Sequence, residues 1–364
     1  MKEEIRAYGW TLPHARERRR RPWLNIVLFT LTLVTTTMAG ALQNGVNPLV
    51  DPRQITSGLP FALTLMIILL VHEMGHYLMA RYHGVRATLP YFIPAPSFIG
   101  TFGAFIKMES PPLDRRSLFD VGAAGPLAGL MLAIPAVIIG LHLSAVSTDE
   151  GTAGGIILGS SILLELLSQL TLGFLPDEAN ITMHPIGFAG WIGLFVTALN
   201  LLPVGQLDGG HVTYALFGQR HIWVSRLSLV VILLLGFVHI LGLIHSWEGW
   251  LIWGLLLLFM GVRHPPPLDP YTPLDLKRKI LGWFVLAVLT LTFIPAPFSF
   301  HQPKLRREQF TPKPARPPLE AVEARAGQVD RTIHFIVEDV NERSPYLEPI
   351  LHHHYPSGSR ALHL

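Results

Sequence analysis

The chain has 364 residues, of which 50% are hydrophobic and 15% are charged, and its formal net charge is +3 at pH 7. Soluble domains carry about 25% charged residues, so this composition indicates a protein that crosses a membrane several times. The absence of cysteine excludes disulfides, thiolate zinc sites and a cysteine nucleophile, and so small a net charge does not call for a nucleic-acid partner.

Apolar segments long enough to cross a bilayer recur along the chain. A hydrocarbon core about 30 Å thick takes roughly 20 residues of helix. We count six or seven spans and predict an all-α polytopic membrane protein. The windows are 23–42, 61–82, 119–143, 186–202, 222–244, 250–262 and 280–297, with flanking residues added to the fourth and the sixth.

The basic residues indicate how these spans are oriented. The cluster RERRRRP precedes the first span, and more Lys and Arg follow in 84–118, near 220–226 and in 263–279, whereas 144–185 contains none. Loops rich in Lys and Arg stay in the cytoplasm, so we expect a cytoplasmic N-terminus. We divide the chain into a basic cytoplasmic segment (1–22), a transmembrane domain (23–298) and a flexible polar tail (299–364).

The second apolar window ends in VHEMGHYLMAR, residues 71–81. In a helix His72 and His76 lie about one turn apart on one face, where both imidazoles can bind one metal ion. Glu73 lies about 100° round the helix, where it can hold a water molecule and take its proton. Ionisable groups inside a membrane cost on the order of 2.5–3.5 kcal/mol each, so three within five positions favour a function. The alternative is a polar cluster at the membrane boundary.

Two features follow this motif. The segment ATLPYFIPAPSFIGTFGAFIKMES (87–110) has two runs typical of strands around a turn rich in Pro and Gly, with an ordinary cytoplasmic loop as the alternative. The third span opens with Gly122, Gly125 and Gly129, whose spacing allows a neighbouring helix to approach closely. We interpret these glycines as packing residues near the second span.

The segment GIILGSSILLELLSQLTLGFLP (155–176) is long enough to cross the membrane, but Ser161, Glu165 and Ser168 give it one polar stripe. Such a stripe favours an amphipathic helix at the extracytoplasmic surface or packed on the bundle. A crossing here would reverse every later span and place the basic residues of 263–279 outside. We therefore predict that 155–176 does not cross.

A catalytic zinc ion takes three protein ligands and leaves one position open. The segment WIGLFVTALNLLPVGQLDGGH (191–211) supplies a third candidate ligand, Asp208, after a span interrupted at Pro203 and Gly205. If 155–176 does not cross, the second and fourth spans both run inward, so Asp208 falls in the same half as the histidines. The break must turn the chain back, or the span must start below the surface, for which Pro185 is a suitable first residue.

The run from His72 to His76, together with NLLPVGQLDG from Asn200 to Gly209, resembles the two signature motifs of the site-2 protease family of intramembrane zinc metalloproteases, peptidase family M50. The likeness covers about 61–215, which we take as the catalytic core. It implies one zinc ion per chain bound by His72, His76 and Asp208, water activation by Glu73, and stabilisation of the substrate or the oxyanion by Asn200. A hydrogen bond between helices is the alternative role for Asn200.

The resemblance also implies that 87–110 forms a re-entrant hairpin whose open edge binds an unwound substrate as an added strand. The 144–185 segment is too short for an inserted PDZ domain. In lacking one, the chain is similar to the cyanobacterial and plastid branch of the family. We expect an integral protein of a bacterial cytoplasmic membrane. For His184 and His211 we favour local hydrogen bonds over auxiliary catalytic roles. In the tail, RTIHFIVEDV (331–340) favours a short strand, and LHHHYPSG is not a constrained metal site.

The function predicted is therefore that of a zinc metalloendopeptidase which cleaves transmembrane segments of membrane proteins, as in regulated intramembrane proteolysis. Its partners would be such a substrate and the lipid bilayer. The alternatives are a catalytically silent relative that binds membrane proteins and an ion-binding transporter. The presence of all four catalytic and ligand groups disfavours the first, and the lack of an internal repeat with paired broken helices disfavours the second.

Overall fold

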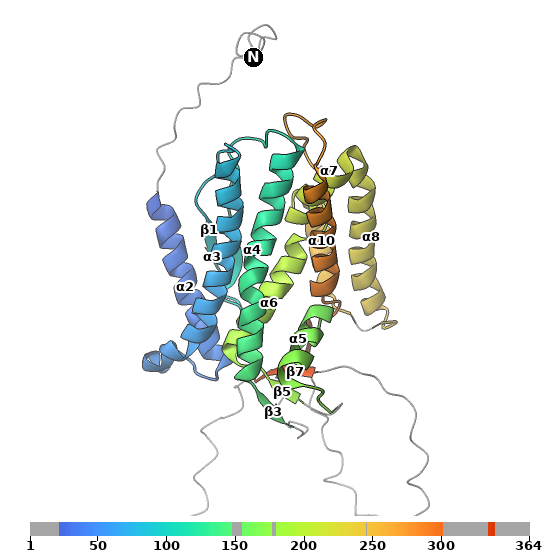
Figure 1. Ribbon diagram of the computed structural model, residues 1–364. Coiled ribbons are helices and arrows are strands. Elements are labelled where there is room, and N and C mark those ends of the chain that lie inside the picture. The colour runs from blue at the N-terminus through green and yellow to red at the C-terminus, as the bar shows by residue number, and fades with distance from the viewer. Residues whose placement is uncertain (1–21, 148–154, 177–179, 245, 301–333, 339–364) are drawn as a thin grey trace, which may run out of the picture.

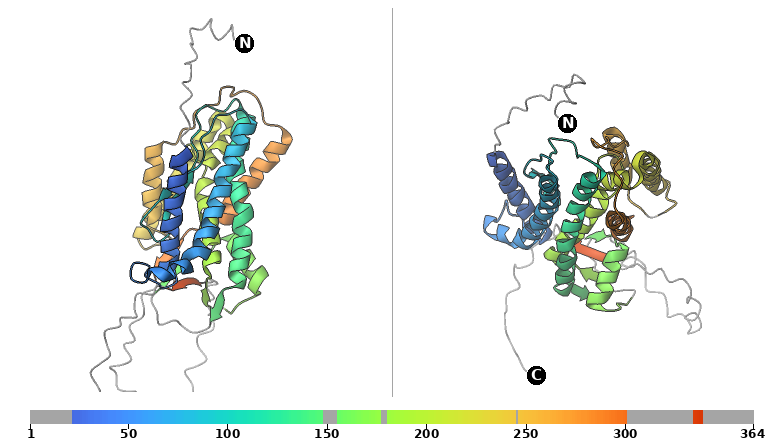
Figure 2. Two further views of the ribbon diagram at one scale, coloured as in Figure 1. Left: turned by 90° about the vertical axis from the view of Figure 1, so that its left-hand side faces the viewer. Right: turned by 45° about the horizontal axis from the view of Figure 1, so that its top comes forward.

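The computed structural model describes residues 22–147, 155–176, 180–244, 246–300 and 334–338. These residues form a bundle of helices with a small sheet at one end (Figure 1), and the views in Figure 2 show the long helices side by side with similar axis directions. The helices are α2 (Pro22–Gln43), α3 (Leu59–Tyr82), α4 (Arg115–His142), α5 (Ile162–Leu172), α6 (Pro185–Asn200), α7 (Asp208–Phe217), α8 (His221–Ile240), α9 (Gly249–Met260) and α10 (Leu276–Thr292), with 3-10 turns η1 (Pro52–Gly58) and η2 (Gly218–Arg220). The strands are β1 (Tyr91–Pro94), β2 (Thr101–Phe105), β3 (Ala145–Ser147), β4 (Gly155–Leu158), β5 (Asn180–Thr182), β6 (Phe298–Phe300) and β7 (His334–Glu338).

Four helical segments among the described residues are long and apolar enough to cross a membrane. They are α2, η1 with α3, α4, and α7 continued through α8. The helices α6, α9 and α10 occupy three further predicted windows but have only 16, 12 and 17 residues. The predicted number of six or seven spans therefore includes helices shorter than the roughly 20 residues of a full crossing.

The segment 155–176 contains β4 and the 11-residue helix α5. At 1.5 Å per residue α5 is about 16 Å long, too short to cross a bilayer. The Ser161 hydroxyl caps it by accepting a hydrogen bond from the amide of Leu164 (3.2 Å). Helix α5 lies at the end of the bundle that carries the sheet, so the chain returns to α6 without crossing there. Helices α3 and α6 therefore run in the same direction (Figure 1), as predicted.

The all-α prediction is wrong in one respect, because a five-stranded sheet in the order β3-β5-β7-β4-β6 covers this end of the bundle. Its strands have three to five residues, too few for an alternating pattern to stand out in the sequence. The strand predicted within 331–340 is present as β7, parallel to β5 and antiparallel to β4. Residues 299–300 of the predicted tail end β6, and the rest of the tail, 301–333 and 339–364, lies outside the described residues, as do residues 1–21.

Helix α4 is central because it packs against α3, α6 and α7. It begins with a capping box, in which the Asp114 carboxylate accepts from the Ser117 amide (2.8 Å) and the Ser117 hydroxyl accepts from the Asp114 amide (3.0 Å). Further along, Gly140 meets Gly187 of α6 so closely that a Cβ on Gly140 would lie 2.0 Å from the Gly187 Cα. Helix α4 therefore packs against both α3, which carries His72 and His76, and α6, which ends at Asn200.

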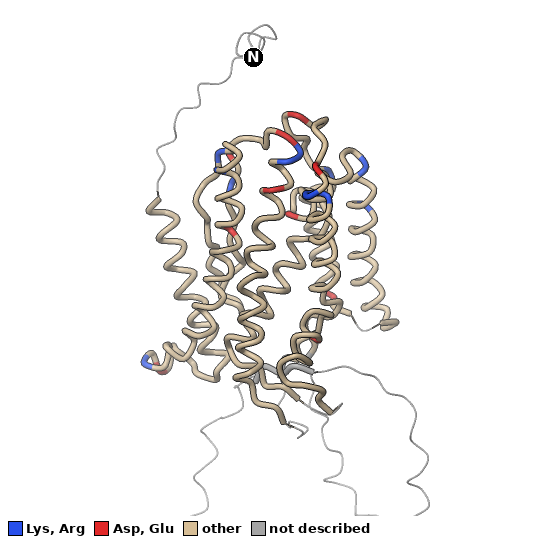
Figure 3. The backbone as a smooth tube through the Cα atoms, viewed as in Figure 1, with Lys and Arg blue, Asp and Glu red and all other residues tan. Residues whose placement is uncertain are grey.

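Charged side chains fix the end of the bundle opposite the sheet. Asp120 of α4 accepts two hydrogen bonds from Arg278 of α10 (2.6 and 2.8 Å) and lies 2.8 Å from His83 beyond α3. The Arg115 guanidinium donates to the last carbonyls of α7, Ala215 and Leu216. Lys and Arg gather at this end, with one exception near η1 (Figure 3).

The β1–β2 hairpin lies in the segment predicted for it. Its strands pair antiparallel with Tyr91 opposite Phe105, and hydrogen bonds from the amide of Thr88 to Lys107 O (3.0 Å) and from the amide of Glu109 to Arg86 O (2.7 Å) extend the pairing. Helix α2 holds the hairpin in place, since the Thr35 hydroxyl donates to Gly100 O (2.6 Å) and the Asn25 side chain to Pro90 O (2.8 Å).

Candidate active site

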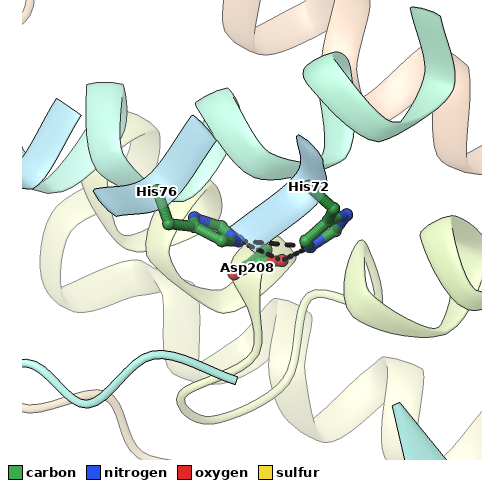
Figure 4. Close-up of side chains that lie close together, drawn as sticks. All are labelled: His72, His76 and Asp208. Carbon is green, nitrogen blue, oxygen red and sulfur yellow. Dashed lines mark hydrogen bonds and ion pairs between the residues drawn. The ribbon is translucent and has the colours of Figure 1, made fainter. Parts of the chain in front are cut away.

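Three side chains predicted to bind metal converge between α3 and α7 (Figure 4). The Nε2 atoms of His72 and His76 lie 3.4 and 3.3 Å from Oδ2 of Asp208 and 3.2 Å from each other. Both histidines are buried and Asp208 is half-buried. Among the described residues, this is the cluster whose ligand atoms all lie within 4.8 Å of one another.

The separations fit a zinc ion. Two atoms that each lie about 2.0–2.1 Å from a tetrahedral zinc are about 3.3–3.4 Å apart, close to the three distances observed. Two imidazole nitrogens and one carboxylate oxygen are also a ligand set that zinc accepts, with a fourth position left open. The residues present therefore fit a catalytic zinc ion.

Helix α4 is shaped to accommodate the two histidines. A Cβ on Gly125 would lie 2.0 Å from Nε2 of His76, and a Cβ on Gly129 would lie 3.0 Å from Nδ1 of His72. A methyl group at position 125 would overlap the His76 imidazole where it now lies. The predicted packing near the second span is thus confirmed for Gly125 and Gly129, directly against the two histidine rings. Gly122 instead packs against α7, where a Cβ on this glycine would lie 2.5 Å from the Cβ of His211.

A turn between α6 and α7 brings Asp208 to the histidines. Helix α6 begins with Pro185 in its first turn and ends at Asn200, and Gly205 then adopts a left-handed backbone (φ +55°). A Cβ on Gly209 would lie 1.9 Å from the carbonyl oxygen of Leu201, so the chain can fold back this tightly only with glycine there. Asp208 starts α7, as the predicted break requires.

The His76 ring is oriented from the side opposite Asp208. Its Nδ1 lies 2.7 Å from the carbonyl oxygen of Val121. Since a carbonyl can only accept, Nδ1 carries the proton and the lone pair is on Nε2, which faces Asp208. A backbone carbonyl leaves no trace in the residue type, so the sequence could not have indicated it.

Glu73 and Asn200 lie beside the cluster. Glu73 is 6% exposed, and a backbone hydrogen bond from Ile106 reaches its carboxylate. The Asn200 amide nitrogen lies 3.3 Å from Nε2 of His72. Both residues line a cavity of about 410 Å³ with the three candidate ligands, Val121, Gln206, Leu207, His211 and residues 104–108 that follow along the hairpin.

His184 makes a local hydrogen bond, as predicted, whereas the partner of His211 lies in a distant loop. The Nδ1 of His184 accepts from the Ile186 amide and caps α6 (3.3 Å), while Nδ1 of His211 contacts Nε2 of His264. The sequence did not single out His264, which stands in the loop between α9 and α10 with no spacing that links it to the motifs. Burial lowers the pKa of His264 to about 3, so this imidazole is neutral at neutral pH.

Comparison with known proteins supports the two-motif resemblance. The profile of Peptidase family M50 matches residues 60–243. The chain is 36% identical over 246 residues to Probable zinc metalloprotease EGY1, chloroplastic, of Arabidopsis thaliana, with 66% of this chain and 43% of that protein covered. It is 32% identical over 283 residues to Probable zinc metalloprotease EGY2, chloroplastic, of the same plant, with 76% and 48% covered.

The chain spans about half the length of these curated relatives, or somewhat less. The family profile nevertheless covers half of this chain and contains all five residues predicted for the site. The chain belongs to peptidase family M50 and is related to the plastid zinc metalloproteases of that family.

Proposed function

We propose that this chain is a zinc metalloendopeptidase that cleaves transmembrane segments of membrane proteins. The observation that carries the proposal is the convergence of His72, His76 and Asp208 beside Glu73, inside a bundle of apolar helices. The cavity there, of about 410 Å³, has room for a peptide bond and a water molecule. The zinc named in the relatives' descriptions suits this ligand set, and one such cluster in the described residues supports one ion per chain.

The side chains divide the hydrolysis between them. His72, His76 and Asp208 would hold a zinc ion, which would supply Lewis acidity to polarise the scissile carbonyl and lower the pKa of water. Glu73 takes the proton of the attacking water and passes it to the amine that leaves. The Ile106 amide holds the Glu73 carboxylate in place. The Asn200 amide donates to the oxygen that becomes negatively charged, in the manner of an oxyanion hole.

The hairpin supplies an edge for the substrate. Residues Phe105, Lys107 and Glu109 pair with the first strand and its extension, and alternate residues of a strand direct their backbone groups to opposite sides. Ile106, whose amide donates to Glu73, and Met108 therefore direct theirs to the other side, towards the cavity that residues 104–108 line. A helical transmembrane segment would unwind here and add as a strand.

In this proposal the shorter helices α6, α9 and α10 also cross, giving six or seven spans with the hairpin re-entrant between them. The gathering of Lys and Arg opposite the sheet (Figure 3) supports a cytoplasmic location for that end and for the N-terminus. Large apolar side chains exposed on α8 and α9, among them Leu234, Phe237 and Phe259, would face lipid in a bacterial cytoplasmic membrane. The division into 1–22, 23–298 and 299–364 remains part of the proposal.

The test is proteolysis in vesicles. The full chain is reconstituted with a single-span membrane protein, and the products are mapped by mass spectrometry. We expect a cut within the apolar segment that a zinc chelator stops, that added zinc restores, and that Glu73→Gln abolishes. The control Glu165→Gln, in α5 at the far end of the bundle, should cleave like the wild type. Cuts confined to the aqueous loops of the substrate would contradict the proposal.

A further inference from the structure

A second cavity, of about 280 Å³, adjoins the active-site cavity. Met108, Gln206 and His211 line both cavities. The remaining walls of the second come from Leu118 of α4, from residues 109–112 and from residues 264–267 in the loop between α9 and α10. Both of these connections lie at the end of the bundle opposite the sheet (Figure 1).

One continuous stretch of chain runs along both cavities. Residues 104–108 line the first and residues 108–112 line the second. Ile106, which contacts Glu73, stands at the middle of the first part. A peptide that lies along this edge beside Glu73 is therefore led into the second cavity, on the side where Lys and Arg gather (Figure 3).

The walls of the second cavity are suited to an apolar side chain. Five of the lining residues are proline, namely Pro111, Pro112, Pro265, Pro266 and Pro267. Proline has no backbone N–H to donate, so at these five positions the walls offer an incoming main chain carbonyl acceptors only. Met108 and Leu118 add apolar surface. The cavity can therefore hold a side chain without competing for the strand-like hydrogen bonds made further along the edge.

The second cavity is a fixed feature because its two walls are joined. The amide of Leu268 donates to Pro112 O (3.1 Å), and the amide of Asp269 donates to Leu113 O (2.8 Å). The Arg116 guanidinium donates to Pro273 O (3.1 Å), and His264 contacts His211. Two of these contacts hold the loop between α9 and α10 against the segment that follows the hairpin, and one each holds it against α4 and α7.

We infer that the second cavity is a substrate subsite for a large apolar side chain, on the cytoplasmic side of the cleaved bond. A strand added to this edge keeps in step with it, at about 3.3 Å per residue, and residues 109–111 of the second cavity stand three to five positions beyond Ile106. The subsite should therefore receive a residue roughly three to five positions from the bond beside Glu73. The inference rests on the proposed function for its substrate and adds a determinant of where that substrate is cut.

The first test measures contact. Because the chain has no cysteine, Pro266→Cys in a Glu73→Gln background can be labelled at one site with a benzophenone maleimide and irradiated with the membrane substrate. We expect cross-links to substrate residues three to five positions to the cytoplasmic side of the bond that wild type cleaves. The control is Leu268→Cys, which is 67% exposed and outside the lining, and which should give few cross-links. Cross-links from Pro266→Cys to the chain's own tail, to lipid alone or to the other side of the bond would overturn the inference.

The second test measures selectivity. Pro266→Lys places a cation at the cavity, so we expect KM to rise roughly tenfold for a substrate with Leu at the mapped position. The same variant should regain cleavage when that Leu is Asp, whereas Leu268→Lys should behave like the wild type with both substrates. Equal selectivity of Pro266→Lys and the wild type would reject the subsite.

The two proposals can fail separately. Cleavage by the wild type without the expected cross-links would reject the subsite and leave the protease proposal intact. Specific cross-links without any cleavage would reject the protease proposal and leave a peptide-binding cavity. Neither cleavage nor cross-links would reject both.

Discussion

The Nε2 atom of His76 lies 3.3 Å from Oδ2 of Asp208, although the two residues belong to different helices. Helix α4 makes this approach possible, because Gly125 leaves the space that the His76 ring fills and Val121 O holds the other ring nitrogen. The geometry of the candidate site thus depends on residues that do no chemistry themselves.

Gly125→Ala should displace His76 and lower zinc affinity. The added methyl would meet the ring 2.0 Å away, so the ring must move off the position from which Nε2 faces Asp208. We expect at least a tenfold loss of zinc affinity, as seen when groups that orient metal ligands are changed, measured by titration with a competing chelator.

A matched control separates this effect from helix packing. Gly140→Ala also adds a methyl to α4 in tight contact, but against Gly187 of α6 and away from the ligands. It should lower the melting temperature while zinc affinity at a temperature where the protein is folded stays unchanged. Equal losses of zinc affinity in both variants would argue against a specific role for Gly125.

Asn200→Ala should lower kcat by about 10²–10³-fold with little change in zinc content, the size expected when an oxyanion donor is lost. The Asn200 amide lines the cavity, as the oxyanion role requires, and its nitrogen also lies 3.3 Å from Nε2 of His72 in α3, which is the contact that the packing role would use. Steady-state cleavage of a reconstituted substrate measures it. A fall in melting temperature with kcat preserved would instead support the packing role.

Asp120→Asn should destabilise the charged end of the bundle by about 1–3 kcal/mol, the range for a charged hydrogen bond lost from a partly buried site. Arg278 and His83 both depend on this carboxylate. Thermal unfolding in detergent measures the change. Asp275→Asn removes the exposed partner of the same arginine and should leave the melting temperature nearly unchanged; a larger loss there than at Asp120 would contradict our account of this network.

Stability should fall in mild acid because of His264. Its pKa of about 3 in the folded chain is below the ordinary value near 6.5, so the unfolded chain binds the proton more readily. Above pH 6.5 this residue hardly affects the free energy of unfolding. By pH 5 it lowers that free energy by up to about 2 kcal/mol. His264→Gln should reduce the difference between the melting temperatures at pH 7 and pH 5. An unchanged difference would mean that other residues cause the loss of stability in acid.

The sequence was sufficient to predict the parts of the site that depend on residue type and spacing. His72 and His76 share a face because a helix repeats every 3.6 residues, and the turn that returns Asp208 follows from Pro203 and the nearby glycines. The orientation argument from the basic residues also indicated that 155–176 does not cross, and the 11-residue helix α5 found there packs on the bundle through Leu164 and Leu167.

Other features could not be predicted, for physical reasons. The number of full-length spans depends on where helices end, and α6 stops at Asn200 within an apolar run that continues. The sheet is assembled from short strands far apart in the chain. Val121 contributes through its backbone, and His264 reaches His211 only through the path of a loop.

The most direct test of the central claim is to measure bound zinc and turnover together in Glu73→Gln and in Asp208→Ala. We predict that Glu73→Gln keeps one zinc ion per chain and loses turnover on the order of 10²–10⁴-fold, whereas Asp208→Ala loses both. Glu73→Gln with zinc retained and turnover unchanged would contradict the assignment of the general base. Full zinc content in Asp208→Ala would contradict the ligand set.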